Sequence, residues 1–306
     1  MPAFKPSPKP RLSDKFWAFL HKNDSFGESC FQLRVAAANG DLWRTDYLID
    51  RLRGSGNSDT ELEIGYAMQK AAIHGQNAVI EMMFEKDCGL APYKQPRQEQ
   101  RRFCNAAQEA AYKNSDAARL DQKELARLEK LDWREISFLY AVTHDQTATA
   151  KLFLDCGIDA ALDNNRALLL ATAKDFGDMT ALLLVRGADA SANYYEPIHN
   201  GIYHDSSRMF GDSCLDPLLA QTAAVPQDQM QALITAALKE DNFHSPTLEK
   251  VLNFALRQPE KADVKPLFSL PALQWNDVAR NMLEEYQVLA EKTQQPLPRQ
   301  NRKPRV

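Results

Sequence analysis

Apolar residues recur at intervals of three and four along most of the chain, and strict alternation of apolar and polar residues is rare. Intervals of three and four place side chains on one face of a helix, whereas alternation is typical of strands. Alanine and leucine are abundant between the two ends, and glycine is sparse. The pattern therefore predicts an all-α protein.

One helical pattern occurs twice at an offset of 30 residues. The first copy begins at Phe138 and reads FLYAVTHDQTATAKLFLDCGIDAAL, and the second begins at Leu168 and reads LLLATAKDFGDMTALLLVRGADASA. Upstream, LRVAAANGDLWRTDYLIDRL from Leu33 and MQKAAIHGQNAVIEMMFEKD from Met68 are similar at an offset of 35, and a weaker copy begins at Glu109. Self-similarity at a fixed period indicates stacked units of supersecondary structure.

Small residues and turn residues recur at matching places in these copies. Gly157 and Gly187 fall just past a helix, where a left-handed glycine ends it at little steric cost. Asp159 and Asp189 follow two residues later and suit hydrogen bonds to backbone N–H groups in a turn. Alanine pairs are expected to let paired helices approach closely, with apolar triplets filling the layers between them; these pairs are Ala36-Ala37, Ala71-Ala72 and Ala110-Ala111.

The stretch LLLVRGADASA, which begins at Leu182, resembles the second helix and the G-A-D loop of the ankyrin repeat. The resemblance covers about residues 30–200. Gly40 and Gly75 match the glycine that this family has in the turn between its two helices. The resemblance implies an all-α, ankyrin-like helical-repeat solenoid with N- and C-terminal helical caps. An ordinary helical bundle with two similar hairpins is the alternative.

Two departures from the family pattern mark the array as degenerate. The family's T-P-L-H opening is absent from every copy, and Asp145 and Asp175 replace the turn glycine in the later units. These two carboxylates are interpreted as helix caps.

The sequence predicts four segments. Residues 1–11 and 292–306 are tails that contain proline and basic residues but no acidic residue, and we expect them to be disordered. Residues 12–200 form the ankyrin-like domain, beginning with a capping helix whose N-cap is Ser13-Asp14. Residues 201–291 form a long loop and a helical C-terminal region.

Composition and charge narrow the function classes. The formal net charge is −4, and because the tails are basic the body between them is more acidic than this value suggests. Nucleic acid is therefore a disfavoured partner, and a protein with a basic or mixed-charge surface is favoured. No apolar run is long enough to span a membrane. Five scattered cysteines and the lack of a secretory signal favour the cytoplasm.

One stretch could carry chemistry, although phosphate-cradling, dinucleotide, nucleophile-elbow and zincin motifs are absent and no cofactor is predicted. His199, His204 and Asp205 lie within residues 194–216, which show little periodicity. Two imidazoles and a carboxylate could bind a metal ion or form a base oriented by an acid. The spacing matches no metal motif, so an extended finger with exposed polar residues is the preferred interpretation.

A cysteine nucleophile is a further alternative, with Cys156 or Cys214 activated by His204. Cys156 lies at the end of an apolar helix, where a cysteine ordinarily behaves as a small buried hydrophobe. The buried interpretation is preferred.

The repeat tips are the favoured partner-binding surface, because aromatic and arginine residues there anchor partners. Tyr194 and Tyr195 are the strongest candidates, since two adjacent tyrosines at a tip cannot both enter the core easily; the alternative is that one packs against the next unit. Trp43 and Trp133 are interpreted as core or groove-edge residues. The remaining tip and loop candidates are Asn164, Asn165, Arg166, Tyr203 and Arg208.

These observations predict a non-catalytic protein–protein interaction module, a scaffold or adaptor that binds its partner through repeat tips and a concave surface. The first alternative is an enzyme with its site in residues 194–216. The second is a translocated effector or inhibitor of a foreign protein, with the basic tails as a delivery element. The sequence favours no particular oligomeric state.

Overall fold

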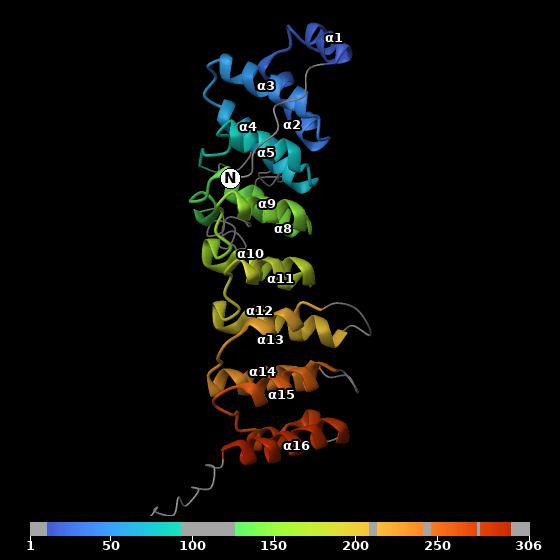
Figure 1. The fold of residues 1–306 in the computed structure, drawn as a ribbon, viewed down its shortest axis with the longest axis vertical. Helices are drawn as coiled ribbons and strands as arrows, with labels where there is room; N and C mark the ends of the chain where they lie inside the picture. Colours follow the sequence, from blue (N-terminus) through green and yellow to red (C-terminus); the bar gives the residue numbers. More distant parts are fainter. Residues whose placement is uncertain (1–10, 93–125, 208–212, 241–245, 274–275, 295–306) are drawn as a thin grey trace, which may run out of the picture. The chain divides into compact units, whose positions relative to one another are not determined.

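The computed structural model describes residues 11–92, 126–207, 213–240, 246–273 and 276–294. Every regular element in these ranges is a helix (Figure 1). Pro92 and Asp132 form an isolated antiparallel β-bridge. The chain divides into two compact units, Met1–Leu162 and Asp163–Val306. The all-α prediction is confirmed for the described residues.

Two rows of helices make up most of the first unit. One row contains α2 (Phe26–Ala38), α4 (Thr60–Ile73) and α8 (Trp133–Thr143), with α4 packed against the other two. The second row contains α3 (Leu42–Gly54), α5 (Asn77–Glu85) and α9 (Thr147–Asp155), each packed against the first-row helix that precedes it in the chain. Successive helix pairs therefore stack on one another within this unit.

Helix α1 (Leu12–Leu20) precedes these rows and is held by Arg51 on α3. The Arg51 guanidinium donates hydrogen bonds to the carbonyl oxygens of His21, Lys22 and Asp24, just past the end of α1. The predicted Ser13-Asp14 cap is wrong by a few residues. Arg11 is the N-cap, and Asp14 accepts a hydrogen bond from its backbone N–H (2.8 Å) because a carboxylate three residues inside a helix can reach back to the capping residue.

Alanines at the predicted places bring the first-row helices close together. Ala37, Ala71 and Ala72 are completely buried, and Ala36 is nearly so. The third predicted pair, at 110–111, and the weaker repeat copy from Glu109 lie outside the described residues. The prediction that alanine pairs lie where helices approach closely is thus confirmed for the two described pairs.

The turns between paired helices use one left-handed residue each. Gly40 and Gly75 have φ of 72° and 68°, and Asp145 and Asp175 take the equivalent place with φ of 55° and 57°. The interpretation of the two aspartates as helix caps is wrong, because the N-caps of the following helices are Gln146 and Phe176. Aspartate is one of the few non-glycine residues that adopt this conformation readily.

The loops that follow the second helices match the sequence prediction. Gly157 and Gly187 both have φ of 98° directly past a helix. Asp159 accepts a hydrogen bond from the N–H of Ala161 (2.9 Å), and Asp189 accepts one from that of Ser191 (2.8 Å). The same backbone turn thus recurs at the 30-residue offset.

Helices α10 to α16 and two short 3-10 helices form the second unit, with α10 starting at its boundary. Helix α12 packs against α13 and α14, α14 against α15, and α15 against α16. The elements are α10 (Leu162–Ala173), α11 (Gly177–Val185), α12 (Ala192–Ser207), α13 (Leu215–Gln221), α14 (Gln227–Glu240), α15 (Pro246–Arg257), η1 (Lys265–Ser269), η2 (Pro271–Leu273) and α16 (Asp277–Gln294).

The irregular loop predicted from residue 194 onward is wrong as far as residue 207, because α12 continues to Ser207. Pro197 lies in the first right-handed turn, where its missing N–H would have no helical partner. Gly201 allows α12 to approach α13, since a Cβ atom there would lie 3.2 Å from Cα of Leu215. The predicted boundary between residues 200 and 201 therefore falls inside a helix.

The predicted basic tails lie mostly outside the described residues. Residues 1–10 and 295–306 are not described, and 292–294, which were expected to be disordered, belong to α16. In the described part of the chain, every helix is too short or too polar to cross a lipid bilayer.

Candidate partner-binding site

Two turns with an unusual backbone mark the tips of the second unit. Residues 163–165 and 193–195 each contain three consecutive residues with positive φ, between 49° and 64°. The two turns are 30 residues apart, so they belong to equivalent positions of the sequence repeat. Left-handed backbone costs about 1–2 kcal/mol per non-glycine residue, and asparagine and aspartate tolerate it best. Two of the six residues are tyrosines, for which the conformation is a genuine outlier.

The middle residue of each turn points outward. Asn164 is exposed, and Tyr194 is 84% exposed, the largest value among the exposed large hydrophobic residues. The side chain of Asn164 donates a hydrogen bond to Oδ1 of Asn193 (2.8 Å), which connects the two tips directly. The second tip therefore presents an aromatic ring from a fixed position.

The third residue of each turn is buried instead. Asn165 is 8% exposed and accepts a hydrogen bond from the N–H of Asp189 (2.7 Å). Tyr195 is 9% exposed and donates its hydroxyl hydrogen bond to the carbonyl oxygen of Ala224 (3.3 Å). Each side chain thus connects its own turn to a segment 24 or 29 residues further along the chain. Asn165 and Tyr195 therefore do not belong to the exposed surface of the tips, and for Tyr195 the alternative of packing against the next segment holds.

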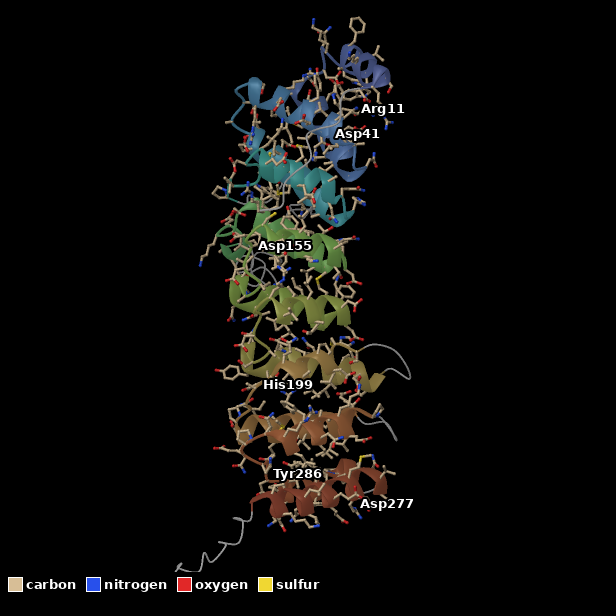
Figure 2. All side chains as sticks on the ribbon, in the orientation of Figure 1. Arg11, Asp41, Asp155, His199, Asp277 and Tyr286 are labelled. Carbon is tan, nitrogen blue, oxygen red and sulfur yellow. The ribbon has the colours of Figure 1, made fainter. Side chains whose placement is uncertain are left out.

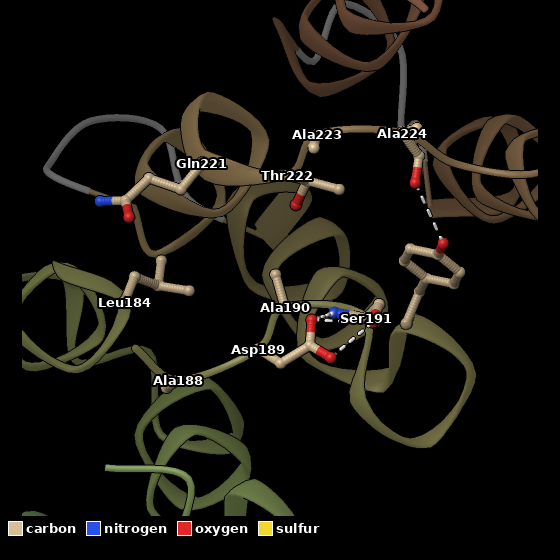
Figure 3. A pocket seen from close by; sticks show the side chains of 10 residues that line it. Leu184, Ala188, Asp189, Ala190, Ser191, Gln221, Thr222, Ala223 and Ala224 are labelled. Atoms are coloured by element: carbon tan, nitrogen blue, oxygen red, sulfur yellow. Dashed lines mark hydrogen bonds between the residues drawn. The ribbon is translucent and has the colours of Figure 1, made fainter. Parts of the chain in front are cut away.

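A pocket of about 310 Å³ lies beside the second tip (Figure 3). One wall comes from the loop after α11, including Asp189 and Ser191. The opposite wall is the stretch 221–224, which begins at the last residue of α13, and Tyr195 also lines the cavity. The tip tyrosines are therefore divided between two tasks: Tyr194 is presented outward, and Tyr195 helps to build the adjoining pocket.

The pocket carries negative charge. Both carboxylate oxygens of Asp189 accept hydrogen bonds from Ser191, at 2.7–2.8 Å, so the carboxylate has a fixed orientation (Figure 3). Burial raises the pKa of the Tyr195 hydroxyl, and the charges of Asp189 and Asp228 raise it further. A cationic group is the complement of such surroundings.

The histidines and the aspartate proposed for chemistry do not converge. His204 Nε2 lies 3.1 Å from the carbonyl oxygen of Ala173. His199, labelled in Figure 2, is half-buried, and burial lowers its pKa although Glu196 opposes the shift. Asp205 is buried and faces α15. Among the described residues, no group of three or more His, Cys, Asp or Glu side chains could hold a metal ion.

Asp205 forms a polar contact between helices. Its carboxylate accepts hydrogen bonds from Thr247 Oγ1 (2.6 Å) and Lys250 Nζ (2.9 Å), and Lys250 also pairs with Asp216 (3.1 Å). Burial by itself raises the pKa of Asp205, but hydrogen bonds from Thr247, Lys250 and Ser213 outweigh it, so the pKa lies below its usual value. The arrangement joins α12, α13 and α15.

The cysteine candidates lack the features of a nucleophile. Burial, followed by the charge of Asp155, raises the pKa of the Cys156 thiol. Cys214 is completely buried. A reactive thiolate needs the opposite surroundings, with a lowered pKa and access to solvent.

The remaining candidates are scattered. Tyr203 is 58% exposed near the other end of α12, and Arg166 is half-buried after the first tip. Arg208 lies outside the described residues. Trp133 is completely buried, as its core interpretation predicts, whereas Trp43 is half-buried and stacks on Tyr47.

Sequence reasoning missed the far wall of the pocket. Residues 221–224 lie at the end of a short helix and just past it, and they contain no motif, so no signal in the sequence connects them to the tip about thirty residues upstream. Ser191 could have been found from the repeated turn, because it follows Asp189 at the spacing of a side-chain-to-backbone hydrogen bond. No family model matches the chain, and no curated protein matches it.

Proposed function

We propose that this protein is a non-catalytic protein–protein interaction module, an ankyrin-like scaffold or adaptor, and that it binds its partner through the tip at residues 193–195. The observation that carries the proposal is the exposed ring of Tyr194 on a strained backbone. Residues with a strained backbone cluster at functional positions in proteins.

Tyr194 has the properties of an interface anchor. Its ring is 84% exposed, and its backbone has a φ of 59°. Tyrosine is enriched among the residues that dominate binding energy, because it buries a large area at a small cost in side-chain entropy. The hydrogen bond between the side chains of Asn164 and Asn193 fixes the turn that carries the ring.

The repeated geometry supports the ankyrin-like arrangement. Left-handed residues recur at the ends of corresponding helices, and the three-residue tips recur at the same offset as the sequence. In this proposal α1 caps the helix rows of the first unit, and the helices after α12 cap the repeats of the second unit.

Charge supports a basic or mixed-charge protein surface as the partner. The formal net charge of −4 includes the basic tails, so the repeat body is acidic. Complementary charge increases the rate of encounter and the selectivity among partners.

The proposal is tested by photo-crosslinking from the tip. A benzoylphenylalanine replaces Tyr194 in one protein and Tyr203 in a matched protein, and both are irradiated in lysate of the cells that make the natural chain. We expect one specific protein to be captured from position 194 and not from position 203. Excess unlabelled wild-type protein should prevent this capture, whereas the Tyr194→Ala variant should not. Equal capture from the two positions, or none from position 194, contradicts the proposal.

A further inference from the structure

The pocket wall formed by residues 221–224 has open backbone groups. Thr222 has an extended backbone, with φ of −77° and ψ of 120°. The N–H groups of Thr222 and Val225 are satisfied by the Leu218 carbonyl oxygen and by Gln258 Oε1. Ala223 and Ala224 are exposed between them, and their N–H groups donate to no described residue. An extended segment with open N–H groups can pair with another extended backbone.

The opposite wall holds a carboxylate without an ionic partner. Asp189 is exposed, and its carboxylate oxygens accept hydrogen bonds, within the described part of the chain, only from the backbone N–H and the hydroxyl of Ser191. A carboxylate has about four acceptor positions, so room for a cation remains.

These two walls suit one occupant. We propose that the pocket receives an extended peptide segment of the partner protein, with a lysine or arginine side chain against Asp189 and its backbone alongside Ala223 and Ala224. The inference rests on the proposed function and specifies the partner's chemistry at the same tip. Tyr195 holds the two walls in register through its hydrogen bond to Ala224.

The exposed walls of the pocket, together with its small size, suit a peptide better than a free small molecule. Its volume of about 310 Å³ accommodates one long side chain together with adjacent backbone. Small-molecule sites cover a range of about 300–1,000 Å³ and bury most of the ligand. This pocket is at the lower end of that range, and its walls include the exposed residues Ala223 and Gln221.

Two variants test the two walls, and the chain offers a matched control for each. Asp189→Asn removes the charge and keeps an acceptor for Ser191; Asp159→Asn makes the same change in the equivalent turn of the first unit. Ala223→Trp fills the pocket; Ala220→Trp adds the same ring at an exposed position that does not line it. Circular dichroism first establishes that all four variants are folded.

The probe is a displayed library of random heptapeptides selected on the full-length protein. We expect lysine or arginine to be enriched at one fixed position of the selected peptides. The dissociation constant of a selected peptide should rise at least tenfold with Asp189→Asn and with Ala223→Trp, and it should stay within twofold for the two controls. Replacing the peptide's lysine or arginine by glutamine should have the effect of Asp189→Asn.

Selected peptides without a cationic preference, or unchanged affinity for Asp189→Asn and Ala223→Trp, overturn the inference. If N-acetyl-lysine amide binds as tightly as the selected peptide, the proposed pairing of peptide backbone with Ala223 and Ala224 is wrong, because that compound lacks an extended chain. Crosslinking from position 194 that persists in both pocket variants leaves the proposed function standing without this inference. Peptide binding that depends on the pocket, without any crosslinking from position 194, would support the peptide site and contradict the proposed function.

Discussion

The indole ring of Trp133 lies directly against Cα of Gly65. A Cβ atom at position 65 would overlap Cγ, Cδ1 and Cδ2 of the indole. Gly65 is on α4 and Trp133 begins α8, so the missing side chain sets the distance between two helices of the first row. Tyr66 also contacts this indole edge-on, with 4.6 Å between ring centroids. The packing is therefore complete only because residue 65 has no side chain.

Gly65→Ala should destabilise the first unit by about 3 kcal/mol. Alanine ordinarily stabilises a helix relative to glycine, but here its methyl group forces the indole out of a close-packed interface. Urea unfolding followed by tryptophan fluorescence measures the change, since Trp17, Trp43 and Trp133 all belong to this unit.

Gly27→Ala is the matched control. Gly27 is on α2, and a Cβ atom there would meet nothing within 4 Å. We expect this variant to be as stable as the wild type or more stable by up to about 1 kcal/mol. Equal effects at positions 27 and 65 would show that the Trp133 contact does not limit the helix spacing.

Gly75→Asp should destabilise the protein, although aspartate occupies the equivalent turn at position 145. Gly75 has a φ of 68°, which strains any side chain, and the amide end of the Gln146 side chain, 2.5 Å from a Cβ atom at position 75, would also have to move. The reverse change, Asp145→Gly, relieves a φ of 55° and should not destabilise. We expect a midpoint of thermal unfolding several degrees lower for Gly75→Asp only. A drop of equal size for both variants contradicts the role of Gln146.

Tyr194→Gly should separate stability from binding. Glycine adopts the left-handed conformation freely, and the exposed ring contributes little packing, so the free energy of unfolding should rise by up to about 1 kcal/mol. Partner binding should nevertheless be lost, because the anchor is removed. Calorimetry measures the stability, and the failure of excess unlabelled Tyr194→Gly protein to compete with crosslinking from position 194 measures the loss of binding. A variant that loses both stability and binding would show that the tyrosine serves the fold.

Asp205→Asn should weaken the second unit at neutral pH by about 1–2 kcal/mol, because Lys250 and Thr247 lose a charged acceptor. The pKa of Asp205 is lower in the folded state than in the unfolded state. The unfolded chain therefore takes up the proton first as pH falls, and the contribution of Asp205 fades below about pH 4.

The stability difference between wild type and Asp205→Asn should consequently be constant from pH 7 to about pH 5 and shrink toward pH 3. Urea unfolding followed by circular dichroism over this range measures it. A difference that grows on acidification would mean that folding raises the pKa of Asp205 instead of lowering it.

Local signals allowed much of the helical structure to be predicted. Gly157 and Gly187 end helices with a left-handed residue, and Asp159 and Asp189 bond to nearby N–H groups, because these interactions join residues a few positions apart. The periodic segments form helices for the same reason. The 30-residue offset in sequence reappears as a 30-residue offset in backbone conformation.

Helix α12 shows where local reasoning failed. Pro197 and Gly201 interrupt its pattern, and the stretch looked irregular. The structure places the proline in the first right-handed turn and uses the glycine for close contact with Leu215, while Ile198 and Ile202 are completely buried. Packing against neighbouring helices stabilises a helix that its own residues favour only weakly.

The sequence by itself determined the helical class, the repeated turns and the presence of two adjacent tyrosines near a tip. Only the tertiary structure decided that Tyr194 is exposed and Tyr195 is buried. Identical side chains have identical intrinsic preferences, so the choice depends on what lies nearby. The carbonyl oxygen of Ala224, brought there by the path of the chain after α13, provides the partner for Tyr195 alone. The pocket between the loop after α11 and residues 221–224 therefore exists only in the folded protein.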